Sequence, residues 1–190
     1  MTGPSAADLT AVASAAQELL GRVPDFDAEV PAMDGDVRRV VVHIASCLTW
    51  YAHDLAAGPS EAVGPMPQWP EDAAPADLVR ELGIAADVLA RVVATAAPHD
   101  RGWHPWGVAD AAGFAAIGIA ELVLHTHDVA SALGLAWTPP AGPVAVTFAR
   151  LFPGVPADGD PWAAMLWATG RDDLPGRERV TEWRYAMEPR

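Results

Sequence analysis

The chain has 190 residues, of which 51% are hydrophobic, so a folded domain is expected and a disordered chain is excluded. Its formal net charge of −13 argues against a nucleic-acid binder, which needs a basic surface. Cys47 is the only cysteine, which excludes an intrachain disulfide. No signal-peptide pattern is visible, and the longest apolar run is interrupted at Glu121, short of the about 18–20 residues of a membrane span. We therefore expect one cytoplasmic domain over residues 1–190 that contacts neither nucleic acid nor a membrane.

Four long helices are predicted in the first two thirds of the chain. Ser5 begins the first helix with a short form of the capping box, because Asp8 lies three residues further on, and Pro24 ends it. Residues 58–75 are rich in proline and glycine and are predicted to form a loop. The apolar spacing predicts the other three helices from about 36 to 57, from about 76 to 96 and from about 109 to 133.

The remainder of the chain carries shorter elements. Two short helices are expected at 140–153 and 160–169, and the second opens with Asp160 and Pro161, a favourable pair for a helix start. The segment Val180–Met187 alternates loosely between apolar and polar residues and is expected to be extended.

These elements define the expected architecture. Amphipathic helices of similar length joined by loops are typical of an all-α fold and, in particular, of a four-helix bundle. The bundle is expected at about residues 5–135. A C-terminal extension of short helices, at about residues 136–190, is expected to pack on the bundle within the same domain.

The stretch Ala120–Ala130, with the sequence AELVLHTHDVA, contains the strongest functional signal. Its residues Glu121, His125 and Asp128 have the spacing i, i+4 and i+7, which places them on one face of a helix. Because the preceding residues are almost wholly apolar, this face is expected to be buried, where an unpaired charge is very costly. A divalent metal is the partner that satisfies a Glu and a His one turn apart, whereas an exposed pair of this kind contributes only about 0.3–0.5 kcal/mol.

A second candidate ligand, His43, lies in the middle of the predicted second helix. A lone histidine on an apolar helix face is more often a hydrogen-bonded core residue than a metal ligand. The Glu121–His125 pair favours the ligand interpretation, because helix bundles build metal sites from side chains on facing helices. Three nitrogen and oxygen ligands leave a coordination position open, which is typical of a catalytic site.

The remaining histidines and the cysteine are weaker candidates. His127 lies about 200° around the helix from His125 and is expected not to be a ligand. Cys47 follows His43 by one turn, which would let it approach the metal, but a lone cysteine in an apolar helix is more often an inert core residue. Three further histidines near helix ends or in loops are expected to be solvated: His53, His99 and His104.

Two segments resemble the hallmark motifs of the DinB-like metal-binding superfamily. They are His43 after VRRVVV and the later stretch ELVLHTHDVASALG. The chain is more closely similar to the family of mycothiol-dependent maleylpyruvate isomerase N-terminal domains. Its C-terminal piece, LFPGVPADGDPWAAMLWATGRDDLPGRERVTEWRY, resembles the ending of short stand-alone members.

The resemblance implies a divalent metal, with zinc first and nickel second, held by His43, Glu121 and His125. It also implies that Asp128 orients a ligand or holds substrate in the catalytic centre. The alternative for Asp128 is a carboxylate on the helix surface or a hydrogen-bond partner for a histidine nitrogen. The isomerases carry an additional C-terminal domain that contributes to the active site, for which 190 residues leave no room. The implied function is therefore the general one, in which the metal activates a low-molecular-weight thiol such as mycothiol.

Three functional hypotheses follow. The first is a thiol-dependent S-transferase or isomerase that acts on an electrophilic substrate, with the metal lowering the pKa of the thiol. The second is a hydrolase that uses metal-bound water, with Asp128 as general base. The third is a non-catalytic bundle that binds a small molecule or a partner protein. A homodimer is compatible with each of them.

Overall fold

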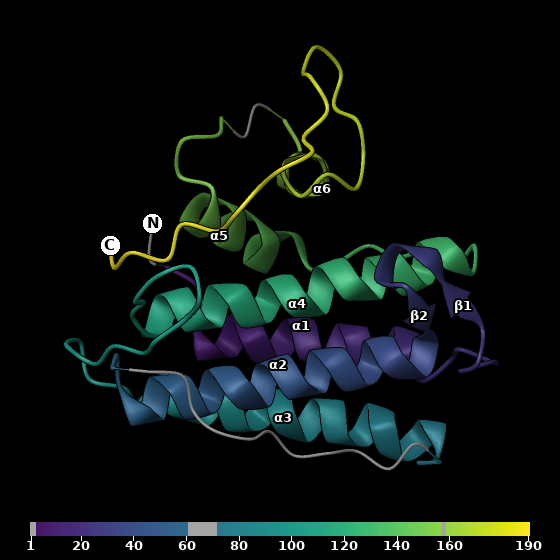
Figure 1. The fold of residues 1–190 in the computed structure, drawn as a ribbon, viewed down its shortest axis with the longest axis horizontal. Helices are drawn as coiled ribbons and strands as arrows, with labels where there is room; N and C mark the ends of the chain where they lie inside the picture. The colour runs from purple at the N-terminus through teal and green to yellow at the C-terminus, as the bar shows by residue number, and fades with distance from the viewer. Residues whose placement is uncertain (1–2, 61–71, 157–158) are drawn as a thin grey trace.

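The computed structural model describes residues 3–60, 72–156 and 159–190, and over these residues the fold is all-α (Figure 1). Within this described part, six α-helices are accompanied only by one 3-10 helix and a two-stranded sheet. None of the described helices is long and apolar enough to cross a membrane. The predicted loop at 58–75 falls largely on residues 61–71, which lie outside the described residues.

The predicted helices agree with the observed ones to within a few residues. In chain order, the elements are α1 (Ala6–Leu20), β1 (Glu29–Val30), η1 (Pro31–Met33), β2 (Gly35–Asp36), α2 (Val37–Ala57), α3 (Pro75–Thr95), α4 (Ala111–Ala132), α5 (Ala141–Leu151) and α6 (Pro161–Ala168). The capping box at Ser5 and the helix start at Asp160 are both confirmed. The structure adds the antiparallel pair β1–β2, whose strands of two residues are too short to show an alternating pattern. The described segment 180–187 contains no assigned strand.

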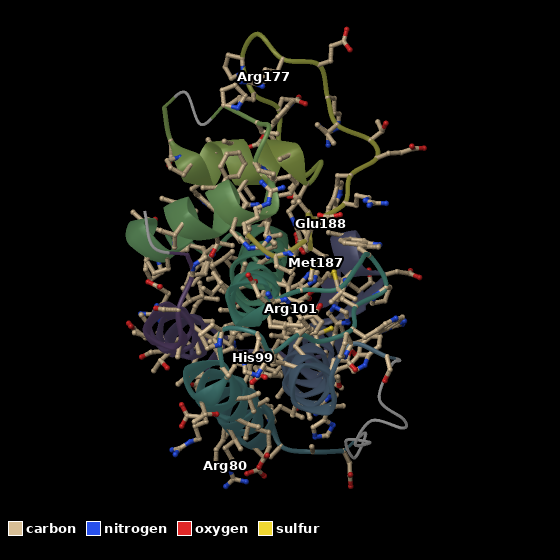
Figure 2. All side chains as sticks on the ribbon, turned by 90° about the vertical axis from the view of Figure 1, so that its left-hand side faces the viewer. Arg80, His99, Arg101, Arg177, Met187 and Glu188 are labelled. Carbon is tan, nitrogen blue, oxygen red and sulfur yellow. The ribbon has the colours of Figure 1, made fainter. Side chains whose placement is uncertain are left out.

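The four longer helices lie side by side, and the C-terminal helices form a second layer on one of them (Figure 1). α2 packs on α3 and α4, and α1 packs on the same two helices from the other side. Figure 2 looks along these helices and shows their side chains meeting in a common interior. α5 packs on α4, and α6 packs on α5. The C-terminal part of the chain therefore covers α4, as expected for an extension packed on the first four helices.

The central helix is α4, which contacts α1, α2, α3 and α5. Its start is fixed by Asp110, whose side chain accepts a hydrogen bond from the backbone N–H of Gly113. At Gly118 a Cβ atom would lie only 2.7 Å from a methyl group of Leu89, so a larger residue would force the Leu89 side chain on α3 to shift. Since α4 is enclosed by neighbouring helices, Glu121, His125 and Asp128 in its second half are largely shielded from solvent.

Candidate metal centre

The three predicted ligands meet between α2 and α4. His43 on α2 and Glu121 and His125 on α4 each provide one ligand atom, and these atoms lie within 4.8 Å of one another (the ligand triad). Oε2 of Glu121 is 3.3 Å from Nε2 of His43 and 3.1 Å from Nε2 of His125. The two imidazole rings stand edge to face, with their centroids 4.9 Å apart. The structure therefore brings together the residues that the sequence predicted from two separate helices.

The donor geometry of the ligand triad fits a tetrahedral metal ion. Metal–nitrogen and metal–oxygen bonds of about 2.0–2.2 Å at a tetrahedral angle place the donors about 3.4 Å apart. The two observed nitrogen–oxygen separations, 3.3 and 3.1 Å, are close to this value. Oε2 of Glu121 is buried, and its polar neighbours are the two imidazole nitrogens, with which it forms ion pairs when the rings are protonated. A cation shared by the three donors would replace these protons.

Tyr51 on α2 orients the Glu121 carboxylate. Its hydroxyl donates a hydrogen bond of 2.9 Å to Oε1, the oxygen that does not face the two histidines. Tyr51 is buried, and burial followed by the charge of Glu121 raises the pKa of its phenol well above the usual value. The sequence analysis did not predict a role for Tyr51. The available signal was its spacing of eight residues from His43, which leaves both on the same side of α2.

A carboxylate and an arginine hold the outer edge of His125. Asp128 is buried, and its Oδ2 lies 2.9 Å from Nδ1 of His125. Arg171 donates two hydrogen bonds to the same carboxylate, from Nε at 2.9 Å and from Nη2 at 2.8 Å. A proton held on Nδ1 leaves the lone pair of Nε2 directed into the ligand triad. The structure thus places Asp128 at the ring edge opposite the triad, and its catalytic role stays a prediction.

Arg171 reaches this position because of how α6 ends. Gly170 follows the helix with a φ of 71°, and the backbone N–H of Arg171 donates to the carbonyl of Leu166. A Cβ atom at Gly170 would lie 2.8 Å from the carbonyl oxygen of Val180, so this turn requires glycine. The sequence analysis missed Arg171, since no local spacing connects it with a residue on α4.

Neighbouring opposite charges shift the pKa values of Glu121 and His125. Burial acts to raise the pKa of Glu121, but the adjacent His125 and His43 outweigh it and hold this pKa well below its usual range. Burial acts to lower the pKa of His125, but Asp128 and Glu121 outweigh it and raise this pKa to about 9. Without a cation, His125 is therefore doubly protonated at neutral pH and lies as an imidazolium between the carboxylates of Glu121 and Asp128. Metal binding has to release that proton.

Cys47 lies beside the ligand triad. Its Sγ is 3.7 Å from Nε2 and 3.9 Å from Nδ1 of His43, and the residue is half-buried. Burial, followed by the negative charge of Glu121, raises the pKa of the thiol. Cys47 does not belong to the group of converging donor atoms, and both roles that the sequence left open for it stay predictions.

Three of the four other histidines lie where the sequence predicted them. His127 lies outside the ligand triad, with its Nε2 3.3 Å from the Ser131 hydroxyl and its ring edge-on to Trp162. His53 is exposed, and the side chain of His99 is 89% exposed in the connection between α3 and α4 (Figure 2).

The prediction for His104 was wrong, because this residue is buried rather than solvated. Its loop folds back through a bridge between Gly102 and Ala109, and its ring packs against Tyr51 and Trp106. Its Nδ1 accepts a hydrogen bond of 3.2 Å from the backbone N–H of Trp106. Burial lowers the pKa of His104 to about 4, against a smaller opposing effect of Glu121.

A hollow of about 560 Å³ opens beside Asp128 and is lined by Arg171, Arg179 and Trp183, among other residues. None of the ligand triad lines it. A small molecule in this hollow would contact the arginine that holds Asp128 rather than the metal ligands themselves.

Comparison with known proteins adds no relative to this picture. No family model matches the chain, and no curated protein or solved structure matches it either. The resemblance to DinB-like proteins therefore stays a prediction, and the function is inferred from the geometry of the ligand triad and its neighbours.

Proposed function

We propose that this chain is a cytoplasmic DinB-like metalloprotein that binds one divalent ion, zinc before nickel, through His43, Glu121 and His125. In this proposal α1–α4 form the four-helix bundle, and α5, α6 and the segment after them form its extension. The observation that carries the proposal is the convergence of two imidazole nitrogens on a buried carboxylate oxygen, with all three donor atoms within 4.8 Å of one another.

The proposed activity is that of a thiol-dependent S-transferase or isomerase, with mycothiol or a similar small thiol as co-substrate. Three protein donors leave a coordination position for a further ligand, and the side chain of His43 is 41% exposed, so the centre is open to solvent on the α2 side. A bound divalent ion supplies thiol deprotonation and Lewis acidity there. Tyr51 and Asp128 keep Glu121 and His125 in place for that task.

The chemistry balances without a redox partner. The thiol gives its proton to solvent, and its sulfur forms a bond to an electrophilic carbon of the substrate. In S-transfer the bond from that carbon to its leaving group breaks, the leaving group departs with the electron pair (chloride in the case of monochlorobimane), and the product is a thioether. If the sulfur adds to a conjugated double bond and leaves again after rotation, the product is the geometric isomer.

The hydrolase alternative has less structural support. A general base needs a free oxygen within reach of the open coordination position. Both oxygens of Asp128 are engaged, one by Arg171 and the other by Arg171 and His125. The non-catalytic alternative predicts instead that loss of the metal leaves every function of the protein unchanged.

Consumption of a thiol in the presence of monochlorobimane tests the proposal. Zinc-loaded protein is expected to accelerate conjugation of mycothiol, and the His125→Ala variant is expected to lose the acceleration. His127→Ala is the matched control, because it removes an imidazole two residues away on the same helix. Equal rates with zinc-loaded and metal-free protein, across several thiols and electrophiles, would contradict the proposal. Hydrolytic turnover without any thiol would favour the hydrolase.

A further inference from the structure

We propose that the hollow beside Asp128 is a regulatory site, which binds a small carboxylate and thereby strengthens metal binding by the ligand triad. The hollow lies between α4, η1, the turn after α6 and the segment that follows this turn. Its volume of about 560 Å³ falls within the range of about 300–1,000 Å³ that is typical of small-molecule sites. The regulatory part of the inference rests on the metal site proposed above, whereas the binding part does not.

Two guanidinium groups line the hollow. Arg171 holds Asp128 with Nε and Nη2, and its Nη1 has no hydrogen-bond partner among the described residues. Arg179 donates hydrogen bonds of 2.8 Å to Asp173 and 3.1 Å to the carbonyl of Gly170, and its side chain is 54% exposed. Because an exposed ion pair of this kind is weak, an incoming carboxylate can share Arg179 with Asp173.

Positive charge prevails among the side chains that line the hollow. They include two arginines and one aspartate, whereas the whole chain has a formal net charge of −13. That aspartate, Asp128, already has both oxygens engaged by Arg171 and His125, which compensates its charge. Two further carboxylates nearby, Asp172 and Asp173, are exposed to water and do not line the hollow. An anion in the hollow therefore meets the guanidinium groups directly, while water screens the outer carboxylates.

The shape of the lining groups favours a carboxylate on a flat apolar body. The planar fork of a guanidinium matches the two oxygens of a carboxylate. Trp183 adds an aromatic wall to the hollow, and its ring is held by Trp106 and Tyr185, with centroid distances of 5.6 and 5.0 Å. Benzoate combines these two features in the smallest molecule and is the probe that we choose.

A continuous series of polar contacts joins the hollow to the ligand triad. Arg171 contacts Asp128 at 2.8 and 2.9 Å, and Asp128 lies 2.9 Å from Nδ1 of His125, a proposed metal ligand. The positive charge of Arg171 opposes a divalent ion at His125, and a carboxylate bound to Arg171 offsets that charge. Bound carboxylate therefore strengthens zinc binding, and by linkage zinc strengthens carboxylate binding by the same factor.

Isothermal titration calorimetry of metal-free protein with benzoate, at low ionic strength, tests the binding part. Wild-type protein is expected to bind one benzoate per chain and not to bind benzyl alcohol, which lacks the charge. Ala132 lines the hollow at the exposed end of α4, so a substitution there disturbs no buried contact. Ala132→Glu adds a negative charge and is expected to raise the benzoate Kd about 10-fold. Ala132→Gln, the matched control of the same size, is expected to raise it much less.

Competition with a chromophoric zinc chelator, with and without saturating benzoate, tests the regulatory part. Benzoate is expected to lower the zinc Kd of the wild type at least about 5-fold, the lower end of typical coupling between sites. Benzyl alcohol is expected to leave this Kd unchanged. In Ala132→Glu the same benzoate concentration is expected to have little effect, which also controls for binding of zinc by benzoate itself.

The outcomes separate this inference from the proposed function. Absence of saturable benzoate binding, or equal benzoate Kd values for Ala132→Glu and Ala132→Gln, overturns the site. Tighter binding of inorganic phosphate than of benzoate contradicts the assignment to a carboxylate. Benzoate binding that leaves the zinc Kd unchanged overturns the regulatory role and leaves the metal centre intact. Protein that binds benzoate but no zinc contradicts the proposed function and the regulatory role, and supports the carboxylate site alone.

Discussion

Replacing Tyr51 with Phe removes one hydroxyl and tests whether the neighbours of the ligand triad tune metal affinity. That hydroxyl donates a hydrogen bond of 2.9 Å to Oε1 of Glu121 inside the protein. A hydrogen bond to a charged group contributes about 1.5–3 kcal/mol. Loss of a group that orients a metal ligand typically weakens metal binding about 10–100-fold, which corresponds to a similar free energy. We therefore expect the zinc Kd of Tyr51→Phe to rise about 10–100-fold.

Competition with a chromophoric zinc chelator measures this Kd. Thr49→Val is the matched control, because it deletes a hydroxyl on the same helix that donates to the backbone carbonyl of Ala45 rather than to the centre. The control is expected to keep the wild-type Kd. A Tyr51→Phe variant that binds zinc as tightly as the wild type would refute the proposed role of the hydrogen bond, and with it the orientation of Glu121 described above.

Further predictions concern the arginine and the histidine that surround the centre. Arg171→Met is expected to lower the free energy of unfolding by about 2–4 kcal/mol, measured by urea denaturation, because it leaves Asp128 buried with one partner fewer. Arg80→Met removes an exposed ion pair with Asp77 away from the centre and is expected to cost about 0–1 kcal/mol; equal losses in the two variants would contradict the burial argument. The pKa of His104 falls from 6.5 to about 4 on folding. The contribution of His104 to the free energy of unfolding is therefore fully present above pH 6.5 and is lost as the pH drops towards 4. This loss is expected to be about 2 kcal/mol after allowance for partial solvent contact, and it should disappear in His104→Gln; an unchanged pH profile in that variant would contradict it.

Local spacing made two of the three members of the ligand triad predictable. Glu121 and His125 are one turn apart on a helix whose apolar sequence indicated burial, and α4 does enclose them. Prediction of His43 as a ligand also required that the helix at 36–57 face the helix that carries Glu121 and His125. Helix lengths and the resemblance suggested that arrangement, and the structure places the three donors together.

The neighbours of the triad could not be predicted in the same way, because they depend on tertiary placement. Arg171 reaches Asp128 only through the turn that ends α6, and no periodicity connects residues 43 positions apart. Tyr51 could not be predicted, because its hydrogen bond to Glu121 depends on how α2 is rotated against α4. His104 was expected in solvent because loops usually are exposed, whereas its loop folds onto the aromatic side chains of the interior.

The central claim is that the ligand triad binds one divalent ion, and metal content per chain tests it most directly. Elemental mass spectrometry of protein purified without a histidine tag or chelator is expected to find about one equivalent of zinc or nickel. His125→Ala should lose this metal, and His127→Ala should retain it. Wild-type protein that holds no metal and takes up none on reconstitution would contradict the claim.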